Sequence, residues 1–122
     1  MSESTRECLF CRIIRGEIPS KKIYEDDEIF AFLDINPIRP VHFLIIPKQH
    51  IASLMDAEPS HERVLGRMLA KANELAVSQG LHEGFRTIIN TGRIGQQEVY
   101  HLHAHILGGD QLLGPMLKRI AP

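Results

Sequence analysis

Apolar residues recur at helical spacing in two stretches of the chain and predict two helices. The first run ends before Gly16 and predicts a short helix with a glycine stop. The second is a longer stripe, which Ser60 can cap and which ends near Gly80. The short run consists of Leu9, Phe10, Ile13 and Ile14, and the long stripe of Val64, Leu65, Met68, Leu69, Ala72, Leu75 and Ala76.

Shorter apolar runs bounded by turn residues predict strands. They cover residues 23–25, 29–33, 42–46, 85–90 and 99–107. Prolines after the second run and glycines after the fourth mark loops. Most neighbouring runs lie too close together for parallel crossovers, so we expect a mainly antiparallel sheet with one long helix between two groups of strands.

Length and composition indicate a single folded domain over residues 1–122. Hydrophobic residues make up 43% and charged residues 24% of the 122 residues, which is typical of a globular protein. We expect residues 1–7 to form a flexible N-terminus and residues 110–122 a C-terminal tail. The formal net charge of −1 gives no electrostatic case for a nucleic-acid or membrane partner. Since neither a signal peptide nor a membrane helix is evident, we expect a cytoplasmic protein.

Three histidines alternate with apolar residues in the last predicted strand. Because side chains alternate between the faces of a strand, His101, His103 and His105 share one face, roughly 7 Å apart. The residues between them face a core. Such a row suits phosphate chemistry, since a neutral ring can attack phosphorus while its neighbours donate hydrogen bonds. A zinc site and a purely structural role are the alternatives.

Two loops favour a nucleotide as the ligand. Residues 92–97 contain two glycines just before the histidine strand, where backbone N–H groups can cradle a phosphate. Asp34 follows a predicted strand and opens the proline-rich loop, where its carboxylate can accept both ribose hydroxyls. Each signal is weak alone, because such residues also form ordinary turns.

Residues 101–107 match the signature His-φ-His-φ-His-φ-φ of the histidine triad family, in which φ is apolar. The chain resembles the Hint branch of that family, the purine nucleoside phosphoramidases, from about Cys8 to Met116. Further matching segments are Ile18-Pro19 and residues 34–37, 42–48, 90–92 and 97–100. The resemblance implies an α+β fold, with a five-stranded antiparallel sheet and one long and one short helix. It also implies a homodimer whose sheets join into one ten-stranded sheet.

The resemblance implies a reaction and assigns roles to four histidines. His103 attacks the phosphorus of a nucleoside phosphoramidate, an amine leaves, and water releases a purine nucleotide such as AMP or GMP. His105 contacts the phosphate, His101 lies beside the site, and His42 supports His103. No catalytic cofactor is required. A nucleotide-binding scaffold protein and a dinucleoside polyphosphate hydrolase are the alternative functions.

Further residues are assigned to the nucleotide by the same resemblance. Asp34 corresponds to the ribose ligand, and Ile35 to part of the base pocket. Gln96 stands where glycine is common, and Glu98 where some relatives have serine, so a hydroxyl contact to phosphate is not assumed. The other pocket walls are Leu9, Phe10, Ile13, Ile18, Phe32 and Leu44, and the phosphate-loop contacts are Asn90, Gln97 and Glu98.

A Cys-x-x-Cys pair near the N-terminus predicts a structural zinc site. In a reducing compartment, Cys8 and Cys11 are metal ligands or plain thiols rather than a disulfide. By resemblance to bacterial zinc-binding relatives, His50 and His101 complete a Cys2His2 set. Buried thiols under the short helix are the alternative. If His101 binds zinc, it cannot also donate a proton.

Overall fold

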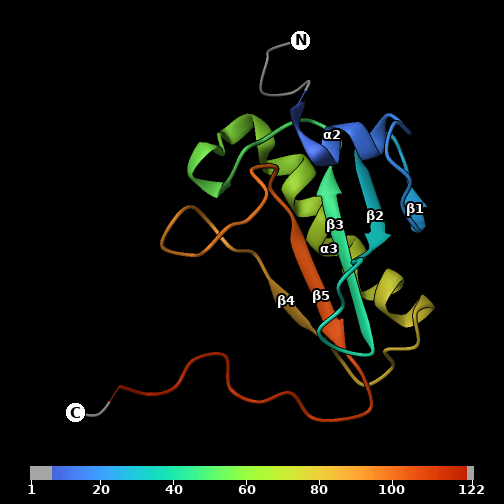
Figure 1. Cartoon of the computed structure of the whole chain (residues 1–122), viewed down its shortest axis with the longest axis vertical. Helices are drawn as coiled ribbons and strands as arrows, with labels where there is room; N and C mark the ends of the chain where they lie inside the picture. The colour runs from blue at the N-terminus through green and yellow to red at the C-terminus, as the bar shows by residue number, and fades with distance from the viewer. Residues whose placement is uncertain (1–6, 121–122) are drawn as a thin grey trace.

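A five-stranded antiparallel sheet in the order β1-β2-β3-β5-β4 forms the centre of the computed structural model, which describes residues 7–120 (Figure 1). Apart from Glu7, the predicted flexible N-terminus lies outside the described residues. The strands are β1 (Lys22–Glu25), β2 (Ile29–Leu33), β3 (Val41–Pro47), β4 (Arg86–Ile88) and β5 (Ala104–Gly108). The helices are α2 (Leu9–Ile14) and α3 (Glu62–Ser78), with single 3-10 turns η1 (Leu54–Asp56) and η2 (Pro59–His61).

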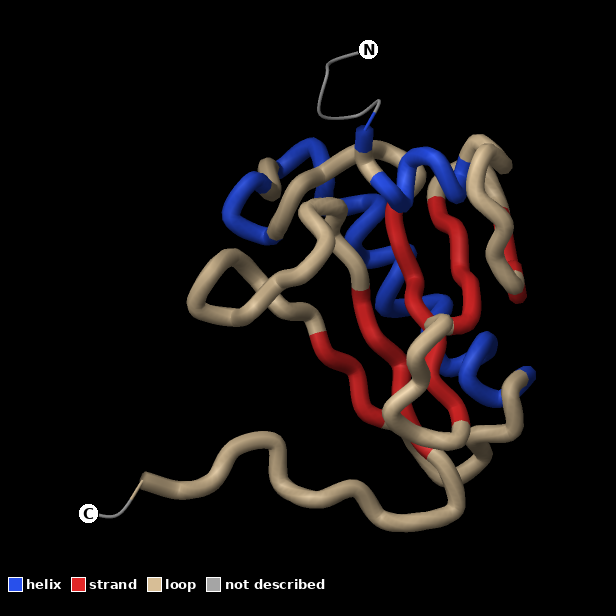
Figure 2. The backbone as a smooth tube through the Cα atoms, in the orientation of Figure 1, coloured by secondary structure: helices blue, strands red, loops and turns tan. Residues whose placement is uncertain are grey.

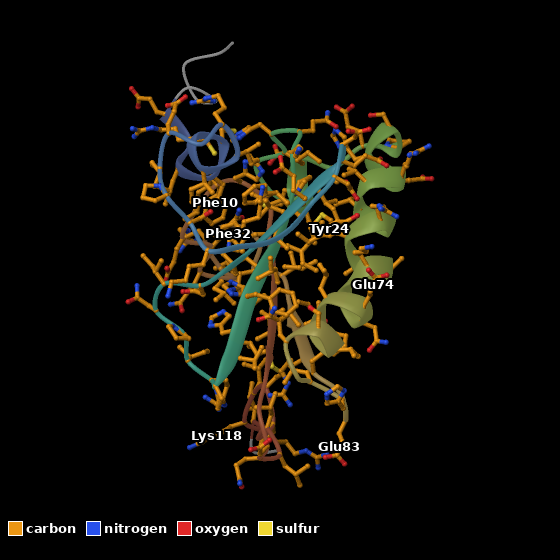
Figure 3. All side chains as sticks on the ribbon, turned by 90° about the vertical axis from the view of Figure 1, so that its right-hand side faces the viewer. Phe10, Tyr24, Phe32, Glu74, Glu83 and Lys118 are labelled. Atoms are coloured by element: carbon orange, nitrogen blue, oxygen red, sulfur yellow. The ribbon has the colours of Figure 1, made fainter. Side chains whose placement is uncertain are left out.

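The sheet is covered on both faces. Figure 3 shows α3 on one side of the sheet and the labelled Phe10 and Phe32 on the other. On the α3 side, Met68, Ala72 and Leu75 pack against strand residues such as Phe43 and Ile45. On the other side, α2 packs against apolar side chains of β2 and β3. Both strands are therefore almost wholly buried, which explains their continuous apolar sequences.

The long helix agrees with its prediction in position but not in its start. It ends at Ser78, two residues before Gly80, which has the left-handed φ of 94° expected after a helix. Ser60 is not its cap, contrary to prediction, because it lies inside η2, where Glu58 and His61 form the capping box. Of the predicted stripe, Leu69 also differs, since 53% of it is exposed.

The histidine strand is shorter than the sequence predicts. Pairing of β5 with β3 extends only to Ala104, and pairing with β4 only to His105. Residues 99–103, predicted as strand, are therefore not paired with a strand, although the Leu102 N–H donates to the Ile51 carbonyl at 2.7 Å. Likewise, the strand predicted over 85–90 is confined to Arg86–Ile88. The expected alternation still holds, because Leu102, Ala104 and Ile106 all lie in the core on the α3 side.

The C-terminal tail follows β5 and has no regular structure through residue 120 (Figure 2). Almost all of its residues are exposed, and several of them are large and apolar. Leu112, Leu117 and Ile120 are each more than four-fifths exposed, at 101%, 86% and 91%. Within residues 7–120, no helix has the length and apolar character needed to span a membrane.

Candidate active site and metal centre

A cavity of about 590 Å³ opens on the α2 side of the sheet. Twelve of the predicted site residues line it, and they come from α2, three strands and two loops. Sequence segments far apart in the chain thus meet at one concave site. The predicted residues in its wall are Leu9, Phe10, Ile13, Phe32, Asp34, Ile35, His42, Leu44, Asn90, Glu98, His103 and His105.

Phe10 joins the apolar end of this cavity to the histidines. Its ring lies edge-on to Phe32, with centroids 5.5 Å apart (Figure 3), and edge-on to His103, at 5.2 Å. The same ring approaches His101, at 5.9 Å. The short helix α2 therefore supplies an aromatic wall against which the central histidine is held.

The His103 side chain is 5% exposed, and a nearby backbone carbonyl holds its ring in place. Its Nδ1–H donates to the His101 carbonyl at 2.7 Å, which leaves Nε2 as the ring nitrogen with a free lone pair. Burial lowers the pKa of His103, an effect that the His101 carbonyl and the nearby Asp34 and Glu98 oppose. A neutral imidazole whose Nε2 is free has the electronic form of a nucleophile.

A chain of hydrogen bonds places the proton of His105 on Nε2, the nitrogen that is unprotonated in His103. The Ile38 N–H donates to His42 Nδ1 at 3.2 Å, so His42 carries its proton on Nε2. That Nε2–H donates to His105 Nδ1 at 3.0 Å, so the remaining His105 nitrogen carries a proton. Burial, with His103 and His42 adding to it, lowers the pKa of His105 to about 4. His105 is thus a neutral hydrogen-bond donor, and its support comes from His42.

Asp34 lies beside the middle member of this chain, His42. One carboxylate oxygen accepts the Asn36 N–H at 2.8 Å, and the other lies 3.4 Å from His42 Nε2. Ligand atoms of Asp34, His42 and His105 lie close enough together to suggest a metal site. The hydrogen bond from Ile38 argues against that, because it leaves a proton, not a lone pair, on His42 Nε2. The group is better described as a hydrogen-bond network.

A second cluster joins Cys8, Cys11, His50 and His101, none of which lines the cavity. The four ligand atoms all lie within 4.8 Å of one another. His101 Nδ1 is 3.3 Å from Cys8 Sγ and 3.6 Å from Cys11 Sγ, and His50 Nδ1 is 3.4 Å from Cys11 Sγ. Burial raises the pKa of the Cys11 thiol to about 12 and lowers that of His101 to about 4.

These residues fit zinc. A tetrahedron with Zn–S of about 2.3 Å and Zn–N of about 2.0–2.1 Å has S···N edges of about 3.5 Å, close to the separations above. The His101 Nε2–H donates to the Pro47 carbonyl at 2.7 Å, which directs the Nδ1 lone pair at the sulfurs. Zinc-bound histidines are commonly oriented by such a bond from their second nitrogen. The four protein ligands would leave no open position for water.

His101 connects the two centres but does not line the cavity. Its ring is fully buried in the Cys/His cluster, while its carbonyl accepts the hydrogen bond from His103. Ile18 and Gln97 also lie outside the cavity wall. Ile18 packs beside the apolar cluster under α2. The Gln97 side chain holds the glycine loop together, accepting the Gly92 N–H at 3.0 Å and donating to the carbonyls of Ala52 and Val99.

Several lining residues were not predicted from sequence. Gln96 lines the cavity, whereas the resemblance assigned a phosphate-loop contact to its neighbour Gln97. Gln96 has a left-handed φ of 58°, a conformation that glycine usually adopts. Its place in a glycine-containing loop was the available signal. The others carry no sequence signal beyond their proximity to predicted residues. They are Asn36, Ile38, Ile88, Val99 and Leu107.

Comparison with known proteins shows the family to which the chain belongs. A family profile described as "Scavenger mRNA decapping enzyme C-term binding" matches residues 7–119. The crystal structure of a HIT family hydrolase from Legionella pneumophila Philadelphia 1 superposes with a TM-score of 0.85 at 47% identity, covering 89% of this chain and 98% of that one. The chain belongs to the histidine triad family. The predicted family and fold are thereby confirmed.

Two relatives of this histidine triad protein are about half identical to it. The purine nucleoside phosphoramidase of Escherichia coli (strain K12) is 51% identical over 112 residues, covering 91% of this chain and 93% of the relative. Protein HitA of Neisseria gonorrhoeae is 52% identical over 101 residues, covering 83% of this chain and 94% of the relative. In this histidine triad protein, the signature residues 101–107 run from the Cys/His cluster, past the cavity, into β5.

Proposed function

We propose that this protein hydrolyses purine nucleoside phosphoramidates through a covalent nucleotidyl-histidine on His103. The observation that carries the proposal is the hydrogen bond from His103 Nδ1 to the His101 carbonyl. It leaves Nε2 unprotonated on a neutral residue in the wall of the cavity. The similarity to a purine nucleoside phosphoramidase supports the same conclusion.

The chemistry has two steps. Nε2 of His103 forms a bond to the α-phosphorus, the P–N bond breaks, and the nitrogen leaves as an amine after taking up a proton. Water then attacks the phosphorus, the P–Nε2 bond breaks, and the nucleoside monophosphate is released. Overall one water is consumed, with a hydrogen on the amine and the hydroxyl on phosphorus. The protonated nitrogen of His105 stabilises charge on the phosphoryl oxygens in both steps.

The remaining cavity residues bind the nucleotide. We assign the base to the apolar end between Phe10 and Phe32, with Leu9, Ile13, Ile35 and Leu44 as further walls, and the ribose hydroxyls to Asp34. Asn90 and the loop before His101 face the phosphate. Gln97 acts indirectly, since its carboxamide fixes the shape of that loop.

Zinc in the Cys/His cluster has a structural role in this proposal. When bound, it would tie α2 to the segments carrying His50 and His101. His101 is then a ligand and not a proton donor. The chemistry rests on His103 and His105, with no catalytic cofactor. We further propose a homodimer, with neither nucleic acid nor membrane as a partner.

A turnover assay tests the function. Adenosine and guanosine phosphoramidates are incubated with the protein, with and without a chelator, and release of AMP or GMP is measured. We expect hydrolysis of both to exceed that of a dinucleoside polyphosphate. A stable AMP complex with no turnover of either phosphoramidate would contradict the proposal and favour a nucleotide-binding scaffold protein.

A further inference from the structure

The cavity has an unusual charge balance for a site that accepts a phosphate. Of the residues in its wall, only Asp34 and Glu98 carry a formal charge, and no lysine or arginine is among them. The formally charged side chains in the wall are therefore both negative.

The two carboxylates differ in their surroundings. Asp34 accepts the Asn36 N–H and lies beside His42, so its carboxylate already has partners in the hydrogen-bond network with His42 and His105. Glu98 is exposed, and within residues 7–120 no hydrogen bond or ion pair involves its carboxylate. It lines the same cavity as His103. Glu98 thus faces the reaction centre without a partner.

A free carboxylate next to the reaction centre is poorly suited to hold phosphate. It has no proton to donate at neutral pH, and it repels the negative phosphoryl oxygens. The phosphate-contact role that the sequence resemblance assigns to Glu98 therefore does not suit its side chain. The amine side of the P–N bond is the part of the substrate that can carry a positive charge there.

We propose that Glu98 determines leaving-group specificity, favouring phosphoramidates whose amine portion carries a second, positively charged group. This inference rests on the proposed function. An exposed ion pair contributes little, roughly 0.2–1 kcal/mol, so we expect a preference in kcat/KM of about 1.5- to 5-fold over an uncharged amine of equal length. The preference should weaken as added salt screens the pair.

The test compares two adenosine 5′-phosphoramidates, one of pentylamine and one of 1,5-diaminopentane, whose free amino group is cationic. The ratio of their kcat/KM values is measured for the wild-type protein, E98Q and E98K, at low and high salt. E83Q is the matched control, because Glu83 carries the same charge but lies outside this cavity. Using a ratio removes any general effect of a variant on activity.

We expect the ratio to exceed one in the wild-type protein and in E83Q, to fall to about one in E98Q and to reverse in E98K. It should also fall with salt in the wild-type protein, which requires no variant. A wild-type ratio of one, or an unchanged ratio in E98Q, would overturn the role of Glu98 while leaving phosphoramidate hydrolysis intact. Failure to hydrolyse either compound would overturn the proposed function itself.

Discussion

At the scale of single residues, the link between His42 and His105 is open to direct test. His42→Leu removes the Nε2–H donor to His105, whereas His42→Gln retains an N–H near the same position. Losing one partner of a buried hydrogen bond costs about 1–3 kcal/mol, so we expect kcat to fall about 5- to 150-fold in the leucine variant and less in the glutamine variant. Steady-state kinetics measure this, with thermal melts as the control for folding. Equal activity in both variants and the wild-type protein would show that the bond is unimportant.

Acid should destabilise the protein through His105. Its pKa of about 4 in the folded state lies below the ordinary value of about 6.5, so the unfolded chain binds the proton first. The free energy of unfolding should therefore be level above about pH 7 and fall between about pH 6.5 and 4. His42, His103 and Asp34 face this ring and share its environment. Urea unfolding at several pH values measures the slope, which should be shallower in His105→Asn. Identical slopes would contradict the prediction.

Sequence alone identifies the histidines but not their partners. The alternation in residues 101–107 predicts which side chains share a face, and the structure agrees. The contact of His42 with His105 depends on strand register, because His42 pairs with Leu107 and so lies diagonally across from His105. A slip of one residue would turn every side chain to the other face. No local pattern fixes that register, so sequence alone does not predict the contact between His42 and His105.

At the scale of elements, α2 has six residues and is too short to be stable alone. We expect about one zinc per chain by metal analysis, and the metal should hold this helix in place. Chelation, or Cys8→Ser with Cys11→Ser, should cost at least about 2 kcal/mol, roughly 8 °C in Tm for a domain of this size. Turnover by the molecules that remain folded should change much less. Loss of chemistry in a demonstrably folded protein would refute a structural role, and absence of zinc would leave the cysteines as buried thiols.

Element boundaries were predicted where local chemistry decides them. The glycines after both helices and the prolines around β3 mark their ends in the sequence. The start of β5 was misplaced because an apolar, alternating segment is strand only where another strand pairs with it, and pairing with neither neighbour extends past Ala104. Ser60 failed as a cap because Pro59 begins a separate 3-10 turn. The start of β5 and the start of α3 thus depend on contacts between distant segments and on the neighbouring turn, which a local sequence pattern does not contain.

At the scale of the whole molecule, exposed edges and an exposed tail favour a dimer. The sheet ends in β1 and β4, whose outer backbone groups have no strand partner among the described residues. Edge strands of this kind invite pairing with a symmetry mate. The apolar tail side chains are further surface that a second copy would cover. Light scattering at micromolar concentration should give twice the 13.8 kDa chain mass. A mass of one chain would refute the dimer.

The measurement that tests the central claim most directly is mass spectrometry of protein quenched during turnover of an adenosine phosphoramidate. We predict a nucleotidyl adduct on the peptide carrying residues 101–105, localised by fragmentation to His103. His103→Ala should form no adduct and show no turnover, while keeping its fold and much of its affinity for AMP. An adduct on His101 or His105, or full turnover by His103→Ala, would contradict the account.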